Sequence, residues 1–264
     1  MLGMRDRRGQ TLEPAPPGAP LPAAAPRRLP WGGLMDFLFP RSCAGCGGRV
    51  EAPAGHLCWN CLAGLPLIQL PYCAVCGDPV EGRVDERFVC YACAGTPPGF
   101  EAARSAARYR GPLRRMLQAF KYHGALWLAP DLVRLLAACQ ATFPDMAATD
   151  AVTYVPLYRT RQRERGYNQA ALLAGGLARA LGKPLLRNAI QRLRDTGTQT
   201  HLTAGARVTN VHLAFGVRRA EAVRGQRLLL VDDVMTTGAT VSECARVLKA
   251  VGAARVFGLT VARG

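Results

Sequence analysis

The chain has 264 residues, of which 49% are apolar and 20% charged, and its formal net charge is +16. This length accommodates one α/β domain and a smaller module. It contains no apolar run long enough to span a bilayer, so no membrane span is predicted. The charge favours polyanionic partners, from phosphorylated small molecules to nucleic acid, although an arginine-rich proteome with solvated arginines would give the same composition.

The first segment, residues 1–33, is rich in Pro, Ala and Arg and centres on APPGAPLPAAAP. It carries too little apolar surface to order itself, so we expect a disordered tail, with a start at Met35 as an open alternative. Its basic residues precede no apolar core of a signal peptide, and a cytoplasmic protein is expected. Residues 31–39, WGGLMDFLF, are expected to pack as a short apolar helix against the next module.

Residues 34–95 contain four CxxC pairs separated by 11, 11 and 13 residues, a spacing typical of zinc ribbons. Two pairs supply four thiolates to one tetrahedral ion, so we expect structural zinc, one or two ions. Sequential and cross-braced pairing both fit the spacing. A redox role is weaker because no βαβ unit surrounds the pairs, and His56 is expected to be a bystander. The predicted metal ligands are Cys43, Cys46, Cys58, Cys61, Cys73, Cys76, Cys90 and Cys93.

Residues 100–264 alternate between apolar runs of strand length and amphipathic helical segments, which indicates an α/β domain with a parallel sheet flanked by helices. Gly111 and Pro112 open one helix, whose apolar residues include Met116 and Phe120. The lone cysteines Cys139 and Cys244 fall at apolar helix positions and are expected in the core. Strands are expected at residues 102–109, 151–155, 225–231 and 255–262, and further helices at residues 128–139 and 170–181.

Four arginines crowd the segment RTRQRERGYNQA, directly after the strand at residues 151–155. A charge run is usually a solvated face. This one follows the carboxyl end of a strand, where open α/β sheets bind ligands. Guanidinium groups bind phosphate oxygens bidentately and a pyrophosphate needs several of them, so this arginine run is a candidate pyrophosphate site.

Residues 187–212 are polar and basic with weak periodicity. A long segment of this kind in a compact domain is usually disordered or functional. We expect Arg194, Thr196, Gln199 and Arg207 to fold over a bound anion as a lid.

Residues 228–251 carry the most specific pattern in the chain. The run Leu228–Val231 reads as a strand buried on both faces, and it is followed by Asp232 and Asp233. A loop of small residues comes next, and then a helix for which Thr240 and Glu243 fit a capping box. The loop residues are Thr236, Thr237, Gly238, Ala239 and Thr240.

This arrangement suits a phosphorylated sugar. The N–H groups and partial positive charge at a helix N-terminus bind phosphate, and Gly238 lets the backbone approach it. Carboxylates repel phosphate but accept hydrogen bonds from vicinal ribose hydroxyls. A strand whose acids merely cap a helix would explain Asp233 alone, and a Walker loop is excluded because Gly-Lys-Ser/Thr is missing.

The string LLLVDDVMTTGAT closely resembles the phosphoribosyl-pyrophosphate (PRPP) signature of type I phosphoribosyltransferases. Together with LFPRSCAGC, AFKYHG, VPLYRTRQRERGYNQA and RLRDTGTQTHLTAGARVTNV, it gives residues 34–262 a resemblance to the ComF/GntX family of phosphoribosyltransferase-like proteins. The resemblance implies an N-terminal double zinc ribbon and a C-terminal type I phosphoribosyltransferase-like domain.

The resemblance also implies roles for the candidate residues. Asp232 and Asp233 would hold the ribose hydroxyls, residues 236–240 the 5′-phosphate and Arg159 the pyrophosphate, with Mg²⁺ bound alongside PRPP. Residues 194–207 would form the flexible catalytic loop. The expected reaction displaces pyrophosphate from C1 of the ribose, with Lys121 and Arg165 neutralising the leaving charge.

The family is associated with natural competence and DNA uptake, so single-stranded DNA or a competence helicase are expected partners. The alternative hypothesis is a non-catalytic protein that handles single-stranded DNA on the same scaffold. A redox or transcriptional zinc protein would leave the PRPP signature unexplained. The acceptor that attacks the ribose and the oligomeric state stay open.

Overall fold

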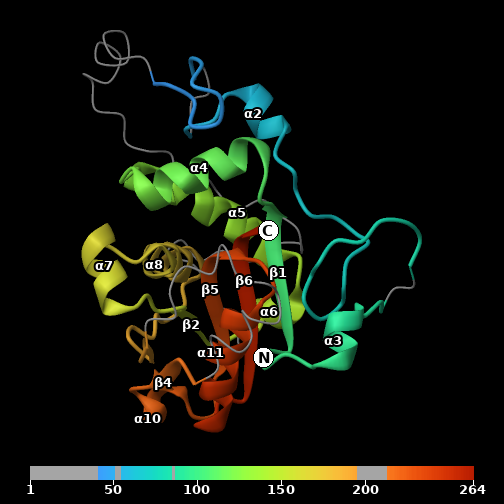
Figure 1. Ribbon diagram of the computed structural model, residues 1–264, viewed down its shortest axis with the longest axis vertical. Coiled ribbons are helices and arrows are strands. Elements are labelled where there is room, and N and C mark those ends of the chain that lie inside the picture. Colours follow the sequence, from blue (N-terminus) through green and yellow to red (C-terminus); the bar gives the residue numbers. More distant parts are fainter. Residues whose placement is uncertain (1–40, 51–54, 85–86, 195–212) are drawn as a thin grey trace, which may run out of the picture. The chain divides into compact units, whose positions relative to one another are not determined.

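The computed structural model describes residues 41–50, 55–84, 87–194 and 213–264, and residues 41–264 form one compact unit (Figure 1). The expected tail, the apolar helix at residues 31–39 and the lid residues Thr196, Gln199 and Arg207 lie outside the described residues.

The centre of the fold is a four-stranded parallel sheet with the strand order β1-β6-β5-β2. The predicted parallel sheet is therefore confirmed. All four predicted strands are present, namely β1 (Ala102–Arg108), β2 (Ala151–Tyr154), β5 (Arg227–Met235) and β6 (Arg255–Arg263).

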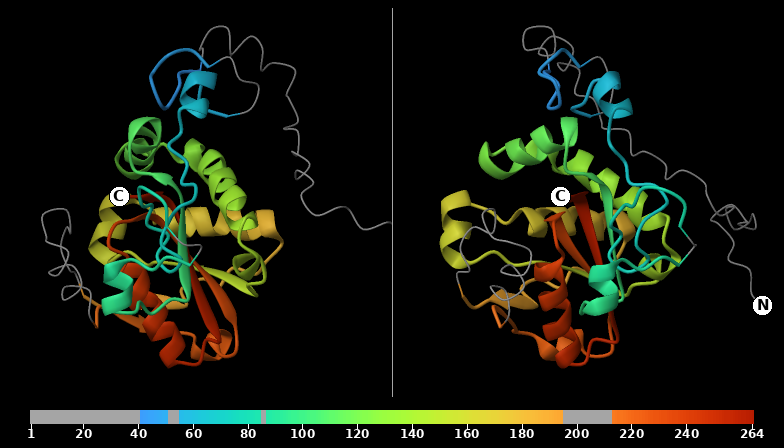
Figure 2. Two further views of the ribbon diagram at one scale, coloured as in Figure 1. Left: turned by 90° about the vertical axis from the view of Figure 1, so that its right-hand side faces the viewer. Right: turned by 45° about the vertical axis from the view of Figure 1, so that its right-hand side comes forward.

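The sheet is covered on both faces, because alternate residues of its central strands are buried in two separate apolar clusters. Leu229 and Val231 of β5 pack with helices α4 (Gly111–Tyr122), α5 (Ala129–Ala141) and α8 (Gln169–Leu181). Leu228 and Leu230 pack on the other face with α11 (Ala239–Ala250). Figure 2 shows these layers from two further directions. The strand buried on both faces is thus confirmed.

Shorter elements complete the α/β part. A two-stranded antiparallel hairpin pairs β3 with β4, beside the α11 face of the sheet. Neither strand was predicted, because each spans only three residues and pairs with a segment more than twenty residues away. The short helices and strands of the α/β part are η1 (Leu126–Leu128), α6 (Pro144–Ala147), α7 (Arg159–Arg165), β3 (Ile190–Arg192), β4 (Phe215–Val217) and α10 (Ala220–Val223).

The described helices have identifiable boundaries. Pro112 stands in the first turn of α4, where its missing N–H costs nothing. The Asn168 side chain caps α8 by accepting a hydrogen bond from the Ala171 N–H at 3.3 Å, and Gly182 ends that helix in a left-handed conformation. Local sequence signals therefore fix both ends of the helix that packs beneath β2 and β5.

Two local predictions around the acidic pair are wrong. Strand β5 does not stop at Val231 but continues through both acids to Met235, because β6 runs beside it and pairs Asp232 with Thr260. The capping box does not form, since the N-cap of α11 is Gly238 and no side chain caps the helix. Glu243 instead accepts a hydrogen bond from the Leu213 N–H at 2.9 Å and pairs with Arg246.

The cysteine-rich part packs directly against the α/β part. Its short helices α2 (Trp59–Ala63) and α3 (Tyr91–Gly95) begin directly after Cys58 and Cys90. The chain between the two cysteine clusters lies along β1, where the Ile68 N–H donates to the Ala106 carbonyl at 3.1 Å. This pairing covers an edge of the sheet that would otherwise be open. Among the described residues, no helix is long and apolar enough to cross a membrane.

Candidate functional site

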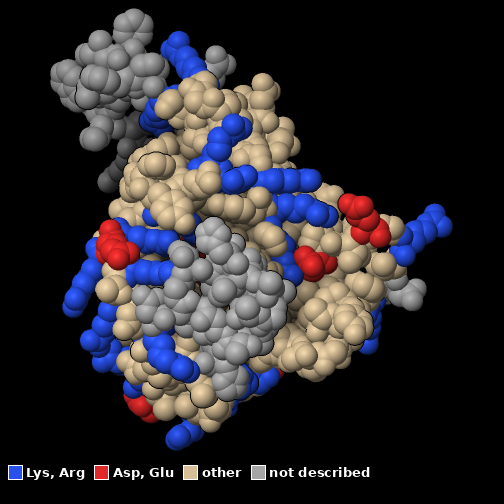
Figure 3. All heavy atoms as spheres, viewed as in Figure 1, with Lys and Arg blue, Asp and Glu red and all other residues tan. Residues whose placement is uncertain are grey.

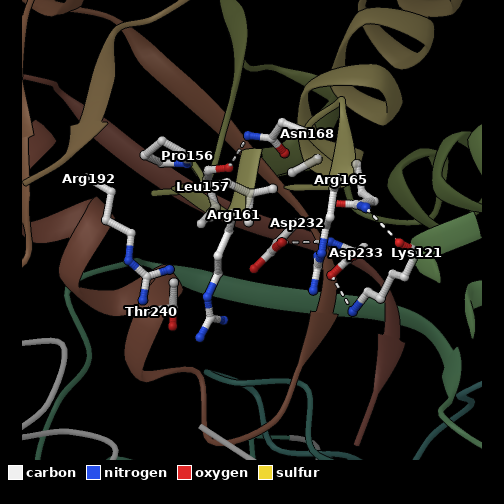
Figure 4. A pocket seen from close by; sticks show the side chains of 13 residues that line it. Lys121, Pro156, Leu157, Arg161, Arg165, Asn168, Arg192, Asp232, Asp233 and Thr240 are labelled. Atoms are coloured by element: carbon white, nitrogen blue, oxygen red, sulfur yellow. Dashed lines mark hydrogen bonds and ion pairs between the residues drawn. The ribbon is translucent and has the colours of Figure 1, made fainter. Parts of the chain in front are cut away.

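A cleft of about 180 Å³ opens at the carboxyl end of the sheet, because β5 is longer than its neighbour β2. The β2–β5 pairing ends at Tyr154 and Val231, one residue before Asp232. The space beyond β2 is the position at which open parallel sheets bind ligands. The cleft is lined by Lys121, Val155, Pro156, Leu157, Arg161, Arg165, Asn168, Gln169, Ala170, Arg192, Asp232, Asp233 and Thr240 (Figure 4).

The two acids of β5 lie at this cleft side by side. The Asp233 side chain is largely buried, and its backbone N–H donates a hydrogen bond to Asp232 Oδ1 at 2.8 Å. Burial and the neighbouring Asp233 charge raise the pKa of Asp232 to about 7. Asp232 is thus an acceptor that exchanges its proton near neutral pH.

Lys121 at the end of α4 forms an ion pair with the second acid. Its Nζ lies 3.0 Å from Asp233 Oδ1, and the two side chains are 17% and 11% exposed. Burial lowers the pKa of Lys121, but the charges of Asp233 and Asp232 outweigh this effect and raise it above the ordinary value. The lysine predicted to neutralise a leaving group is therefore engaged with a carboxylate at the cleft.

The predicted phosphate loop connects β5 to α11. Thr236 and Thr237 are exposed, Gly238 is buried with a φ of 81°, and Thr240 lines the cleft. A positive φ of this size favours glycine. The Thr237 hydroxyl accepts a hydrogen bond from the Ala239 N–H at 3.4 Å. Of the five predicted loop residues, only Thr240 lines the cleft, at the start of α11.

The arginines of α7 divide into two sets. Arg161 and Arg165 are partly buried and line the cleft, whereas Arg159 and Arg163 are exposed and do not. Arg165 is held by Gln169, whose side-chain oxygen accepts a hydrogen bond from it at 3.3 Å. The structure thus brings the predicted Arg165 to the acids but leaves Arg159 outside the cleft.

A further arginine reaches the cleft from the β3–β4 hairpin. Arg192 is the last residue of β3, and it lines the cleft with its guanidinium 5.5 Å from the Phe215 ring centre. Arg194, two residues further on, is exposed and is not among the lining residues. Arg161, Arg192, Asn168 and Gln169 were not singled out from the sequence.

Two neutral side chains hold the cleft together. Asn168 Nδ2 donates a hydrogen bond to the Val155 carbonyl at 3.1 Å, which ties the start of α8 to the end of β2. Gln169 is buried, and its Nε2 lies 3.5 Å from the Lys121 carbonyl. The GYNQ string could have indicated them, since Asn is a preferred N-cap residue and buried amides need partners.

The eight predicted cysteine ligands form two clusters of four. Within each cluster, the sulfur atoms all lie within 4.8 Å of one another. Zn–S bonds of about 2.3 Å in a tetrahedron require neighbouring sulfurs about 3.8 Å apart. The distances are 3.7 Å between Cys46 and Cys58 and 3.8 Å between Cys76 and Cys90, so both clusters fit zinc. The pairing is sequential: Cys43, Cys46, Cys58 and Cys61 form one cluster, and Cys73, Cys76, Cys90 and Cys93 the other.

Backbone amides prepare the Cys43 sulfur of the first cluster for metal binding. Cys43 Sγ accepts hydrogen bonds from the N–H groups of Gly45 and Cys58, each at 3.3 Å. Burial raises the pKa of Cys43, but hydrogen bonds from the backbone N–H groups of Cys58, Cys46 and Gly45 outweigh this effect and lower the pKa to about 6. Thiolates are the form that binds zinc, so these backbone donors favour the metal-binding state of Cys43.

Each cluster is also joined to the α/β part. His56, which is not a ligand, lies 2.7 Å from Asp131 of α5 and 4.5 Å from the Trp127 ring, beside the first cluster. At the second cluster, Arg263 at the end of β6 donates to Asp78 at 2.9 Å and lies 3.9 Å from Cys76 Sγ. His56 is thus a bystander to metal binding, as predicted, and its contacts join the first cluster to α5.

Comparison with known proteins matches both parts of the chain. Residues 34–94 match the model of the double zinc ribbon domain, and residues 168–263 match the model of the phosphoribosyl transferase domain. Together with the parallel sheet and the two cysteine clusters, these matches define a phosphoribosyltransferase-like α/β domain preceded by a double zinc ribbon.

Similarity to curated proteins extends over most of the chain. Competence protein F of Haemophilus influenzae is 32% identical over 223 residues, which cover 83% of this chain and 95% of that protein. DNA utilization protein YhgH of Escherichia coli K12 is 33% identical, with 76% and 93% covered. Competence protein ComFC of Bacillus subtilis is 28% identical, with 80% and 85% covered. The chain belongs to the ComF family.

Proposed function

We propose that this ComF-family protein binds PRPP in the cleft and transfers its phosphoribosyl group to an acceptor, with release of pyrophosphate. One observation carries the proposal: the cleft combines two carboxylates with Thr240 in the first turn of α11 and three arginines. PRPP has vicinal hydroxyls, a terminal phosphate and a pyrophosphate, and each group finds a chemically matched partner in this set.

The acceptors and donors of the cleft suggest a division of labour. Asp232 and Asp233 accept hydrogen bonds from the ribose hydroxyls, and the N–H groups at the start of α11 bind the 5′-phosphate with Thr240. Arg161, Arg165 and Arg192 line the same cleft and neutralise the charge that builds on departing pyrophosphate. Arg161 thereby takes the role that the sequence assigned to Arg159.

Mg²⁺ bound with PRPP would add positive charge to the pyrophosphate oxygens. The carboxylates of the cleft are oxygen ligands of the kind that Mg²⁺ accepts, although Asp233 is already paired with Lys121. The rest of the chemistry depends on positioning. Holding C1 of the ribose between the acids and the arginines aligns the departing pyrophosphate with an incoming nucleophile.

Calorimetric titration of PRPP into the zinc-loaded chain tests this proposal. The wild type is expected to bind PRPP with Mg²⁺ present, and the Asp232→Asn, Asp233→Asn variant to bind at least about a hundredfold more weakly, because two charge-assisted hydrogen-bond acceptors are lost. Arg163→Gln is the matched control, since Arg163 lies on the same helix but outside the cleft. Unchanged affinity in the folded double variant would refute the proposed site.

A second function is favoured by the relatives and by the charge of the chain. One relative is named for competence and another for DNA utilization, and this chain carries a formal net charge of +16. Lys and Arg side chains predominate over Asp and Glu on the face in Figure 3. We propose that the protein works in DNA uptake or DNA use and contacts single-stranded DNA through this basic surface.

Binding of a fluorescent oligonucleotide at increasing salt distinguishes the two roles. A protein that neutralises several phosphates loses affinity linearly on a log–log salt plot, with a slope of roughly −0.7 per phosphate for single strands. We expect such a slope for the wild type and the same slope for Asp232→Asn, Asp233→Asn. If the wild type does not bind the oligonucleotide even at low salt, the DNA-contact role is refuted and only the PRPP proposal stands.

A further inference from the structure

Lys121 directs its ammonium group at the acids of the cleft, as Figure 4 shows. Its Nζ is 3.0 Å from Asp233 Oδ1, and only 17% of the lysine side chain is exposed. Lysine side chains are almost never buried without a charged partner, because removing an ammonium from water is costly. The ion pair is therefore part of the cleft and differs from a solvated surface contact.

The backbone on both sides of this lysine is fixed. Phe120, which precedes it, is fully buried, and its carbonyl accepts a hydrogen bond from the Tyr167 hydroxyl. Gln169 Nε2 lies 3.5 Å from the Lys121 carbonyl. These contacts tie the end of α4 to the start of α8, so the ammonium group is presented to Asp233 by two anchored helices.

Two neighbouring carboxylates in a partly buried cleft require positive charge. Asp232 and Asp233 repel one another, and the Asp233 N–H satisfies only one of the four carboxylate oxygens. A divalent cation with oxygen ligands is one way in which proteins neutralise such a pair. An ammonium group at 3.0 Å is another, and here it comes from the protein itself.

We propose that Lys121 takes the place of a divalent cation at the Asp232–Asp233 pair. This inference rests on the proposed function only where it concerns PRPP: Lys121 then fixes Asp233 as an acceptor for a ribose hydroxyl. Asp232, which Lys121 does not pair with, would be the carboxylate left to help hold a Mg²⁺ that enters with PRPP. Lys121 is thus a positioning residue that acts through Asp233.

The decisive test replaces the ammonium by an apolar side chain of similar length. In the zinc-loaded Lys121→Met variant, Asp233 loses its ion-pair partner, and the acid pair should bind Mn²⁺ at least about tenfold more tightly than in the wild type. Loss of the free-ion signal in electron paramagnetic resonance measures this binding. Adding Asp232→Asn to Lys121→Met should abolish the new site, and Lys121→Arg, which restores a cation, should not create it.

Lys249→Met is the matched control. Lys249 Nζ lies 2.8 Å from Glu101 Oε1, so this variant also removes a lysine from a carboxylate, but from a single one. It should gain no Mn²⁺ site. Lys121→Gln serves as a second uncharged variant if Lys121→Met does not fold. A folded uncharged variant that gains no Mn²⁺ site overturns the inference, and so does a wild type with an Asp232-dependent site of equal strength.

A second experiment, PRPP binding at varied Mg²⁺ concentration, separates this inference from the proposed function. The Mg²⁺ concentration that half-saturates PRPP binding should change at least about threefold in Lys121→Met relative to the wild type, whereas a merely structural role would weaken PRPP binding equally at every Mg²⁺ concentration. The Mn²⁺ titration contains no PRPP. A wild type that binds no PRPP therefore refutes the proposed function while the Mn²⁺ result still decides the role of Lys121.

Discussion

Asp232 is an acid of the cleft whose pKa is raised toward neutral pH. Burial and the charge of Asp233 raise its pKa to about 7, well above that of an unfolded aspartate. The proton that the folded state retains stabilises it; this contribution is fully present below the pKa of an unfolded aspartate and is lost as the pH rises from there through about 7. The Asp232 carboxyl therefore lowers the free energy of unfolding less in mildly acidic solution than in alkaline solution.

Replacing this carboxyl by an amide should remove the pH dependence. Relative to the wild type, Asp232→Asn is expected to gain about 2 kcal/mol of unfolding free energy between pH 5.5 and pH 8, because each pKa unit corresponds to about 1.4 kcal/mol. Urea unfolding of the zinc-loaded proteins across this range measures the difference.

The comparison needs a carboxylate outside the cleft as its reference. Asp145 pairs with Arg255 at the surface and is 69% exposed, so Asp145→Asn should leave the pH dependence as in the wild type. Wild-type and Asp232→Asn curves that run parallel from pH 5.5 to pH 8 would show that the Asp232 carboxyl is already ionised at the acidic end.

At the scale of elements, periodic and capped segments were predictable from the sequence, whereas charged segments were not. Helix α4 buries the predicted Met116 and Phe120, and its start at Gly111 and Pro112 is as expected. The arginine run was considered as a charge cluster and not as a helix. Read as a helix, residues four apart share one face, which would have grouped Arg161 with Arg165 and excluded Arg159.

The remaining errors come from tertiary partners that no local pattern contains. Strand β5 extends to Met235 only because β6 lies beside it, and Arg192 reaches the cleft only because β3 pairs with β4. Glu243 satisfies the local capping rule but instead contacts Leu213, thirty residues earlier. Local signals therefore located the acids, the loop that follows them and Arg165, while Arg192 and the pairing of Lys121 with Asp233 required the fold.

At the scale of the whole molecule, the zinc ribbons and the α/β part share one packed interior. Arg104 of β1 donates to the Ala74 carbonyl at 2.9 Å, next to the second cluster, and its guanidinium lies over the rings of Tyr72 and Phe143. Gly99 packs so closely on α11 that a Cβ would lie 2.4 Å from the Ser242 carbonyl oxygen. The cysteine-rich part and the segment that follows it therefore contact β1 and α11, and α11 begins at the cleft.

Removal of zinc should consequently destabilise the α/β part and not only the ribbons. Structural zinc contributes several kcal/mol to folding, and in a unit of this size about 2–4 °C of melting temperature corresponds to each kcal/mol. Chelation is expected to lower the midpoint of helix melting, followed by circular dichroism at 222 nm, by about 10 °C or more. The helices α4, α5, α8 and α11 dominate this signal, and all lie outside the cysteine clusters.

A control variant separates the dependence of helix stability on zinc from effects of the chelator on cysteines outside the two clusters. Cys139 lies in α5 outside both clusters, so Cys139→Ser should retain the zinc content and the chelation response of the wild type. Zinc released by the chelator is counted with a colorimetric indicator in the same samples. If both ions leave while the helix midpoint stays within about 2 °C, the ribbons fold independently, and the contacts of Arg104, Arg263 and Gly99 do not transmit their stability to the cleft.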